Sequence, residues 1–135
     1  MKTLNALQLQ AKLLSGLRPS KYKCYNLLIA KNTGFDNPAN LCDVGADFQA
    51  LFGSDYRVPA SSGFIGVDGS LSIKFNKLSN DAIYWDISIM GKVWAFNRGD
   101  LIIDKIYFQN ASYTEDIAAL VTVWSDKYAE LNGIS

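Results

Sequence analysis

The chain has 135 residues, of which 49% are hydrophobic and 19% charged, and its formal net charge is zero. This length and balance are typical of one packed domain and exclude a disordered chain, so we expect residues 1–135 to form a single domain. No apolar run approaches the eighteen or so residues of a membrane span, and no signal-peptide pattern opens the chain, which favours a cytoplasmic protein.

The first third of the chain predicts two helices separated by a strand. Leu4, Leu7, Ala11 and Leu14 recur at helical spacing, and the following segment, 22–31, reads as a strand buried on much of both faces. Asn37 and Pro38 are typical of a helix start and Gly53 of a helix end. The predicted buried face of that second helix comprises Leu41, Val44, Phe48, Leu51 and Phe52.

Alternation of apolar and polar residues begins near residue 64 and predicts two hairpins. Asp68-Gly69 is typical of a type I′ turn between strands 64–67 and 70–75. Gly91-Lys92 suits a type II′ turn, and a further strand is expected over 101–109. The residues expected on the buried face of the second hairpin are Ile83, Trp85, Ile87, Ile89, Trp94 and Phe96.

A capping-box pattern, Ser112 followed by Glu115, predicts a C-terminal helix that ends at Gly133. Its apolar stripe would be Ile117, Leu120, Val121, Trp124, Tyr128 and Leu131. The predicted fold is therefore α+β, with the element order α-β-α-β-β-β-β-β-α. An antiparallel meander sheet of five to six strands would carry its helices on one face.

Several chemistries are excluded by residue content. The chain has no histidine, so Ser-His-Asp and Cys-His mechanisms and zinc sites of clustered Cys and His are absent. The two cysteines, Cys24 and Cys42, form no CxxC motif and are expected to be buried thiols. We expect no cofactor. The remaining enzymatic alternative is a metal-dependent enzyme using Asp86, Asp100 and Asp104.

Charge is distributed unevenly along the chain. Residues 1–35 hold six basic and no acidic residues, whereas the remaining residues hold seven basic and thirteen acidic ones. A basic end with nearby tyrosines suits phosphates and stacked bases, which makes nucleic-acid binding an alternative. Simple solvation of one end of the molecule explains the same pattern. The candidate residues are Lys12, Arg18, Lys21, Tyr22, Lys23 and Lys31.

The outer face of the predicted sheet is a candidate surface for a protein partner. Its small, polar and aromatic side chains would form a flat platform for a partner. An ordinary solvated sheet face has the same residue pattern. The candidate residues are Ser72, Lys74, Tyr84, Asp86, Ser88 and Asn97. The apolar face of the first predicted helix is also suited to packing against a second copy of the chain, so a homodimer is an alternative.

These observations favour a non-enzymatic protein that acts by contact with another macromolecule. Small α+β proteins without catalytic groups include inhibitors, immunity proteins and phage accessory proteins, and this analogy extends to the class alone. A protein partner is the leading expectation, with nucleic acid as the alternative and the aspartate-based enzyme as the second alternative.

Overall fold

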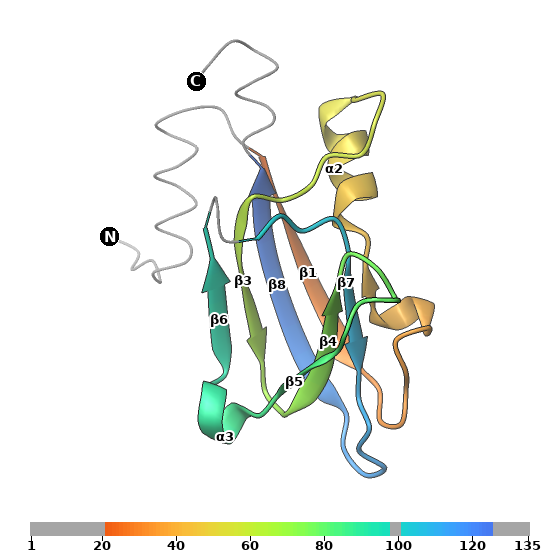
Figure 1. The fold of residues 1–135 in the computed structure, drawn as a ribbon, viewed down its shortest axis with the longest axis vertical. Helices are drawn as coiled ribbons and strands as arrows, with labels where there is room; N and C mark the ends of the chain where they lie inside the picture. Colours follow the sequence, from red (N-terminus) through yellow and green to blue (C-terminus); the bar gives the residue numbers. More distant parts are fainter. Residues whose placement is uncertain (1–20, 98–100, 126–135) are drawn as a thin grey trace, which may run out of the picture.

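The computed structural model describes residues 21–97 and 101–125. In this part the chain is a mixed α+β protein with two α-helices and eight strands (Figure 1). The elements, in chain order, are β1 (Lys21–Ile29), the 3₁₀ turn η1 (Pro38–Asn40), β2 (Leu41–Cys42), α2 (Val44–Phe52), β3 (Ser62–Val67), β4 (Leu71–Phe75), β5 (Ile83–Trp85), α3 (Ile87–Met90), β6 (Val93–Phe96), β7 (Ile106–Gln109) and β8 (Ile117–Ser125).

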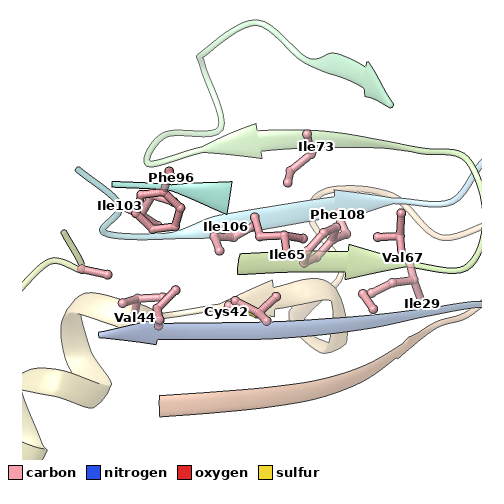
Figure 2. Close-up of a cluster of buried hydrophobic side chains, with 14 of the residues drawn as sticks. Ile29, Cys42, Val44, Ile65, Val67, Ile73, Phe96, Ile103, Ile106 and Phe108 are labelled. Atoms are coloured by element: carbon pink, nitrogen blue, oxygen red, sulfur yellow. The ribbon is translucent and has the colours of Figure 1, made fainter. Parts of the chain in front are cut away.

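The strands form two antiparallel sheets of four, not the single meander expected from the sequence. The first sheet has the order β1-β8-β3-β6 and the second has the order β2-β7-β4-β5. Side chains from both sheets meet in one buried cluster, which includes Ile65 of β3, Val121 of β8 and Phe108 of β7 (Figure 2 shows ten of its members labelled). The sheets therefore pack face to face around a shared apolar core, which removes this surface from water.

The predicted C-terminal helix is wrong over residues 117–125, which form the central strand β8. Its residues pair with β1 on one side and with β3 on the other. The run from Ile117 to Trp124 is rich in β-branched residues, which favour a strand. Ser112 does accept the backbone N–H of Glu115 at 3.2 Å, so the cap contact forms locally without a helix after it. The predicted continuation to Gly133 lies outside the described residues.

The predicted hairpin at Asp68-Gly69 is wrong in its pairing, although both strands exist. β3 pairs with β6 and β8, whereas β4 pairs with β5 and β7, so the Asp68-Gly69 link connects the two sheets. Neither residue has the positive φ that a type I′ turn requires. Asp68 bonds instead to β8, since its carboxylate accepts the N–H of Ala118 at 2.8 Å.

The second predicted hairpin is replaced by a single helical turn. Residues Ile87–Met90 form α3, and the strands on either side of it, β5 and β6, belong to different sheets. Asp86 caps this turn by accepting the N–H of Ser88 at 3.0 Å. An N-cap of this kind favours helical backbone over continuation of a strand.

The first half of the chain follows its predictions in part. Asn37 caps η1 and not an α-helix, and α2 begins later, at Val44. Val44 and Phe48 are buried as predicted, but Leu41 lies in β2 and Leu51 is exposed. Gly53 ends α2 with a φ of 65°, as a C-terminal glycine does. The helix predicted over residues 4–17 lies outside the described residues.

Strand β1 is confirmed, but its predicted burial on both faces is wrong. It lies at an edge of the first sheet and pairs only with β8 among the described strands. Ile29 is buried, whereas Tyr22, Lys23, Cys24 and Leu28 are exposed. An edge strand leaves one side of its backbone unpaired and gains less cover from its neighbours.

The space between the sheets is bordered by two different edges. At the first, which we call the closed edge, β1 and β2 lie beside α2; at the second, the open edge, β5 and β6 lie beside α3 (Figure 1). Helix α2 has nine residues and buries Val44 and Phe48, whereas α3 has four residues, none of them buried. No helix of the described residues is long and apolar enough to cross a membrane.

Candidate functional site

An apolar pocket lies at the open edge, and we call it the edge pocket. It has a volume of about 150 Å³ and is partly open to solvent. None of its lining side chains is charged, and its polar surface is minimal. The lining residues are Ile73 and Phe75 of β4, Ile83 and Trp85 of β5, Met90 of α3, and Trp94 of β6.

The two tryptophans of the edge pocket come from opposite sheets. Trp94 pairs with buried Ile65 of β3, so its side chain points toward the core, where its ring stacks on Phe96 at 5.4 Å between centroids. Its ring also contacts Phe75, at 5.7 Å between centroids. Trp85 donates its Nε1 hydrogen to the carbonyl of Gly91 at 2.7 Å. The polar atom of this indole is thereby satisfied, and the residue after α3 is held against the pocket wall.

Helix α3 places Met90 in the pocket, and polar residues fix the start of that helix. The carboxylate of Asp86 accepts both the N–H and the hydroxyl of Ser88, at 3.0 and 2.7 Å. These hydrogen bonds favour the charged carboxylate and lower the pKa of Asp86. The hydroxyl of Ser70 accepts the N–H of Ile87 at 3.0 Å and so ties the same turn to the segment before β4.

The rim of the edge pocket is an exposed apolar patch. Ile89 is 81% exposed and Met90 is 52% exposed. Ile83, which lines the pocket, is also exposed, whereas exposed Tyr84 and Val93 lie on the outer faces of the second and first sheets. Exposed apolar side chains at the mouth of an apolar pocket are typical of an interaction surface.

The six residues predicted to bind protein do not form one platform. Ser72 and Tyr84 are cross-strand partners and share the outer face of the second sheet with Lys74. The Lys74 ammonium lies 4.7 Å from the Phe35 ring centroid and donates to the carbonyl of Leu78 at 2.8 Å.

The other three predicted protein-binding residues lie elsewhere. Asp86 and Ser88 form the cap of α3 next to the edge pocket. Asn97 follows β6 in the first sheet.

Of the residues proposed for nucleic-acid binding, Tyr22, Lys23 and Lys31 are described with their side chains, and they do not share one surface. Tyr22 and Lys23 are adjacent in β1, so their side chains point to opposite faces of the first sheet. Lys31 follows the other end of this nine-residue strand, and its N–H donates to Asp116 at 2.9 Å. Lys21 opens β1, whereas Lys12 and Arg18 lie outside the described residues.

A charged cluster lies at the closed edge and involves one of the predicted metal-binding aspartates. Arg57 pairs with Asp43 and, at 2.9 Å, with Asp104, and these bonds raise the pKa of Arg57. Asp86 caps α3, and Asp100 lies outside the described residues. Within residues 21–97 and 101–125, no three His, Cys, Asp or Glu side chains are grouped as metal ligands. The described part of the predicted metal site is therefore used in structural contacts.

Two weak acids at the closed edge are held in their neutral form. Burial raises the pKa of the Cys42 thiol to about 12, and the nearby carboxylate of Asp47 adds to the rise. The pKa of Tyr25 is also raised, first by burial and then by the hydrogen bond that its hydroxyl donates to Asp47. A thiol with so high a pKa is a poor nucleophile. Cys42 is buried as predicted, whereas Cys24 is exposed.

The sequence did not predict the edge pocket because it assigned the pocket's residues to one continuous sheet face. Trp85 is buried as expected, but Ile83 and Ile89, expected beside it, are exposed. One signal favoured the observed structure. Asp86 precedes the mainly apolar segment Ile87–Met90, which is followed by Gly91, and this matches the start and stop pattern of a short helix.

Comparison with known proteins identifies no relative of this chain. No protein-family model matches the chain. Neither a curated protein nor a solved structure matches it.

Proposed function

We propose that this chain is a non-enzymatic binding protein that recognises another protein by taking one of its large apolar side chains into the edge pocket. The observation that carries this proposal is an uncharged pocket, with two tryptophans in its wall, that opens onto an exposed apolar rim. Binding energy in protein interfaces is concentrated where an apolar or aromatic anchor fills such a pocket. Inhibitors, immunity proteins and phage accessory proteins of the cytoplasm are the classes to which we assign it by analogy.

The size of the pocket supports a side chain as its occupant. Its volume of about 150 Å³ equals that of an engineered protein cavity that binds benzene. A phenylalanine, leucine or methionine side chain is of this size. Sites for drug-sized ligands are larger, about 300 to 1,000 Å³.

The chemistry of the pocket supports contact over catalysis. Its lining offers two indoles, a phenyl ring, two isoleucines and a thioether, none of which serves as a general acid or base near neutral pH. Asp86, the nearest acidic residue in sequence to Trp85, has a carboxylate already bonded to Ser88. Apolar burial is therefore the interaction that this site offers.

A quantitative pull-down with a blocked pocket tests the proposal. The purified chain, the variant Ile83→Arg and the control Leu28→Arg are compared as baits in a lysate of the source organism, with and without nuclease. Both substitutions place an arginine at an exposed apolar position, but only Ile83 lines the pocket. We expect a protein that survives nuclease treatment to be retained by the wild type and by Leu28→Arg, and to fall at least tenfold with Ile83→Arg.

Two results contradict the proposal. Equal retention by all three baits places the interface elsewhere on the molecule. Retention that disappears with nuclease moves the function to nucleic acid, and Lys23→Glu together with Lys31→Glu then tests the basic residues.

A further inference from the structure

Among the described residues, no strand pairs with the outer backbone edge of β6, the strand beside the edge pocket. β6 pairs with β3 on one side and is the last strand of its sheet in the described part of the chain. Partner proteins use such edges by adding an extended segment as a new strand, which is held by main-chain hydrogen bonds. We propose that the partner of this chain supplies such a segment, which pairs with β6 and places one apolar side chain in the edge pocket. This inference rests on the proposed function.

The register of β6 shows which backbone groups are available. The N–H of Val67 donates to the carbonyl of Lys92 at 2.9 Å, which makes these two residues a hydrogen-bonded pair. Hydrogen-bonded positions alternate along an antiparallel ladder, so Trp94 and Phe96 also direct their N–H and C=O groups toward β3. Val93 and Ala95 direct theirs away from β3. Among the described residues, none bonds to these outward groups.

The same alternation aims a partner side chain at the pocket. An added strand would lie about 4.8 Å beyond β6, with successive side chains on opposite faces of the enlarged sheet. Side chains on the face of Trp94 point toward the second sheet, where Ile83, Trp85 and Met90 line the pocket. Side chains on the other face lie beside Val93 and Ala95, which are exposed and apolar. The pocket lies on one face only, so it requires apolar residues at every second position of the partner segment.

The charge next to β6 adds a second requirement for the partner. Lys92 directly precedes β6 and is exposed, and no acidic side chain of the described residues forms an ion pair with it. An aspartate or glutamate at the matching end of the partner segment is complementary to this charge. β5 offers a poorer edge because it has three residues, of which only Tyr84 directs its backbone groups outward.

Selection from a random seven-residue peptide library displayed on phage, with the full chain as bait, tests this inference. We expect the selected peptides to share apolar residues at alternate positions and an acidic residue near one end. Synthetic copies are then titrated into the protein while the tryptophan fluorescence is followed, because Trp85 and Trp94 line the pocket.

A proline at the free edge separates backbone pairing from pocket filling. Ala95→Pro removes one outward N–H but no bond to β3, and edge strands tolerate proline at such positions. The matched control Ala95→Val keeps the N–H. We expect Ala95→Pro to weaken peptide binding at least tenfold and Ala95→Val less than twofold.

N-methylation of the peptide gives the same answer without altering the protein. Methyl groups on alternate peptide nitrogens, in two registers, place the substituent either toward β6 or toward solvent. We expect binding to be lost in one register and retained in the other. This measurement tests backbone pairing with β6 even if the Ala95→Pro variant unfolds.

The outcomes separate this inference from the proposed function. One outcome contradicts strand pairing but supports the pocket. In it, peptides lose affinity for Ile83→Arg, yet they bind Ala95→Pro as well as the wild type and bind equally in both methylated registers. Peptides insensitive to Ile83→Arg contradict the proposed function itself. A library that yields no binder contradicts the proposed strand pairing. The lysate experiment with Ile83→Arg still tests whether a partner uses the edge pocket.

Discussion

The closed and open edges of this protein border the same core in different ways. At the closed edge, α2 inserts Val44 and Phe48 between the sheets, and the ring of Phe48 stacks on Phe52 at 5.7 Å. At the open edge, α3 contributes only partly buried Ile87 and half-exposed Met90, and about 150 Å³ of apolar space remains. A helix with a buried face completes a core, whereas one helical turn leaves part of it open for a partner.

The two edges also differ in how they use charge. The closed edge carries Arg57 between Asp43 and Asp104, at side chains that are partly exposed, so this cluster orients the segments more than it stabilises them. At the open edge the one carboxylate of the α3 turn, that of Asp86, is used as a cap. The pocket itself stays free of charge, which suits an apolar ligand.

The largest expected difference is in stability after side-chain truncation at each edge. Phe48→Ala removes a fully buried ring, and we expect the free energy of unfolding to fall by about 3 to 5 kcal/mol. Met90→Ala truncates a side chain that is 52% exposed, and we expect a loss below about 1 kcal/mol. Urea unfolding followed by circular dichroism measures both. Similar losses in the two variants would show that the open edge is as important for folding as the closed edge.

A second prediction concerns how tightly the first sheet is packed along β3, the strand that pairs with β6. Gly63 and Gly66 both lie on β3 opposite β6. A Cβ at Gly63 would lie 2.5 Å from the backbone carbonyl oxygen of Thr122, whereas one at Gly66 would meet no atom closer than 3.8 Å. We expect Gly63→Ala to destabilise the fold by about 1 to 3 kcal/mol through overpacking, and Gly66→Ala to be nearly neutral.

Thermal unfolding of these two alanine variants checks this prediction. Equal midpoints would mean that the sheet behind the pocket adapts to an added methyl group. In that case the openness of this edge extends further into the core than the pocket alone.

The smallest expected effect is a loss of stability at alkaline pH, which originates at the closed edge. Burial raises the pKa of Cys42 to about 12 in the folded chain, from 9.0 for an unburied thiol. Its contribution is fully present below the unfolded pKa and falls as the pH rises toward 12, because only the unfolded state then releases the proton. By pH 10 the loss is about 1 kcal/mol.

Cys42→Ala should therefore lose less stability between pH 7 and pH 10 than the wild type does. The matched control is Cys24→Ala, at the exposed cysteine, which should lose as much as the wild type. Urea unfolding at both pH values gives the comparison. Identical losses in all three proteins would contradict the raised pKa of Cys42. The pH dependence that Asp86 contributes at the open edge has the opposite sign. Its pKa is lowered in the folded chain, so its contribution to the free energy of unfolding falls as the pH decreases through the acidic range.

Local signals in the sequence were reliable where the interaction was local. Asn37 does cap a turn, Gly53 does end a helix, and Ser112 does accept the N–H of Glu115. The alternation also identified the strands β3 and β4, and the predicted common face of β4 places Leu71 and Ile73 in the core. These features depend on neighbouring residues, which is why the sequence predicted them.

Long-range pairing was not predictable in the same way. Asp68-Gly69 has the composition of a hairpin turn, but Asp68 bonds to Ala118, fifty positions away, and sends the chain into the other sheet. The segment Ile117–Ser125 followed a cap signal and was assigned to a helix, yet it fills the gap between β1 and β3. Its backbone bonds to two strands far away in sequence, and no local pattern records that competition.

By itself the sequence determined a mixed α+β chain without histidine chemistry, with a helix that ends at Gly53. It also placed strands at residues 22–31 and 70–75, close to the observed β1 and β4. Only the tertiary structure decided that the strands divide into two facing sheets and that their open edge leaves a pocket between Trp85 and Trp94. The reason is physical. A pocket is apolar surface that packing does not fill, and it depends on how far apart two sheets and a short helix come to rest.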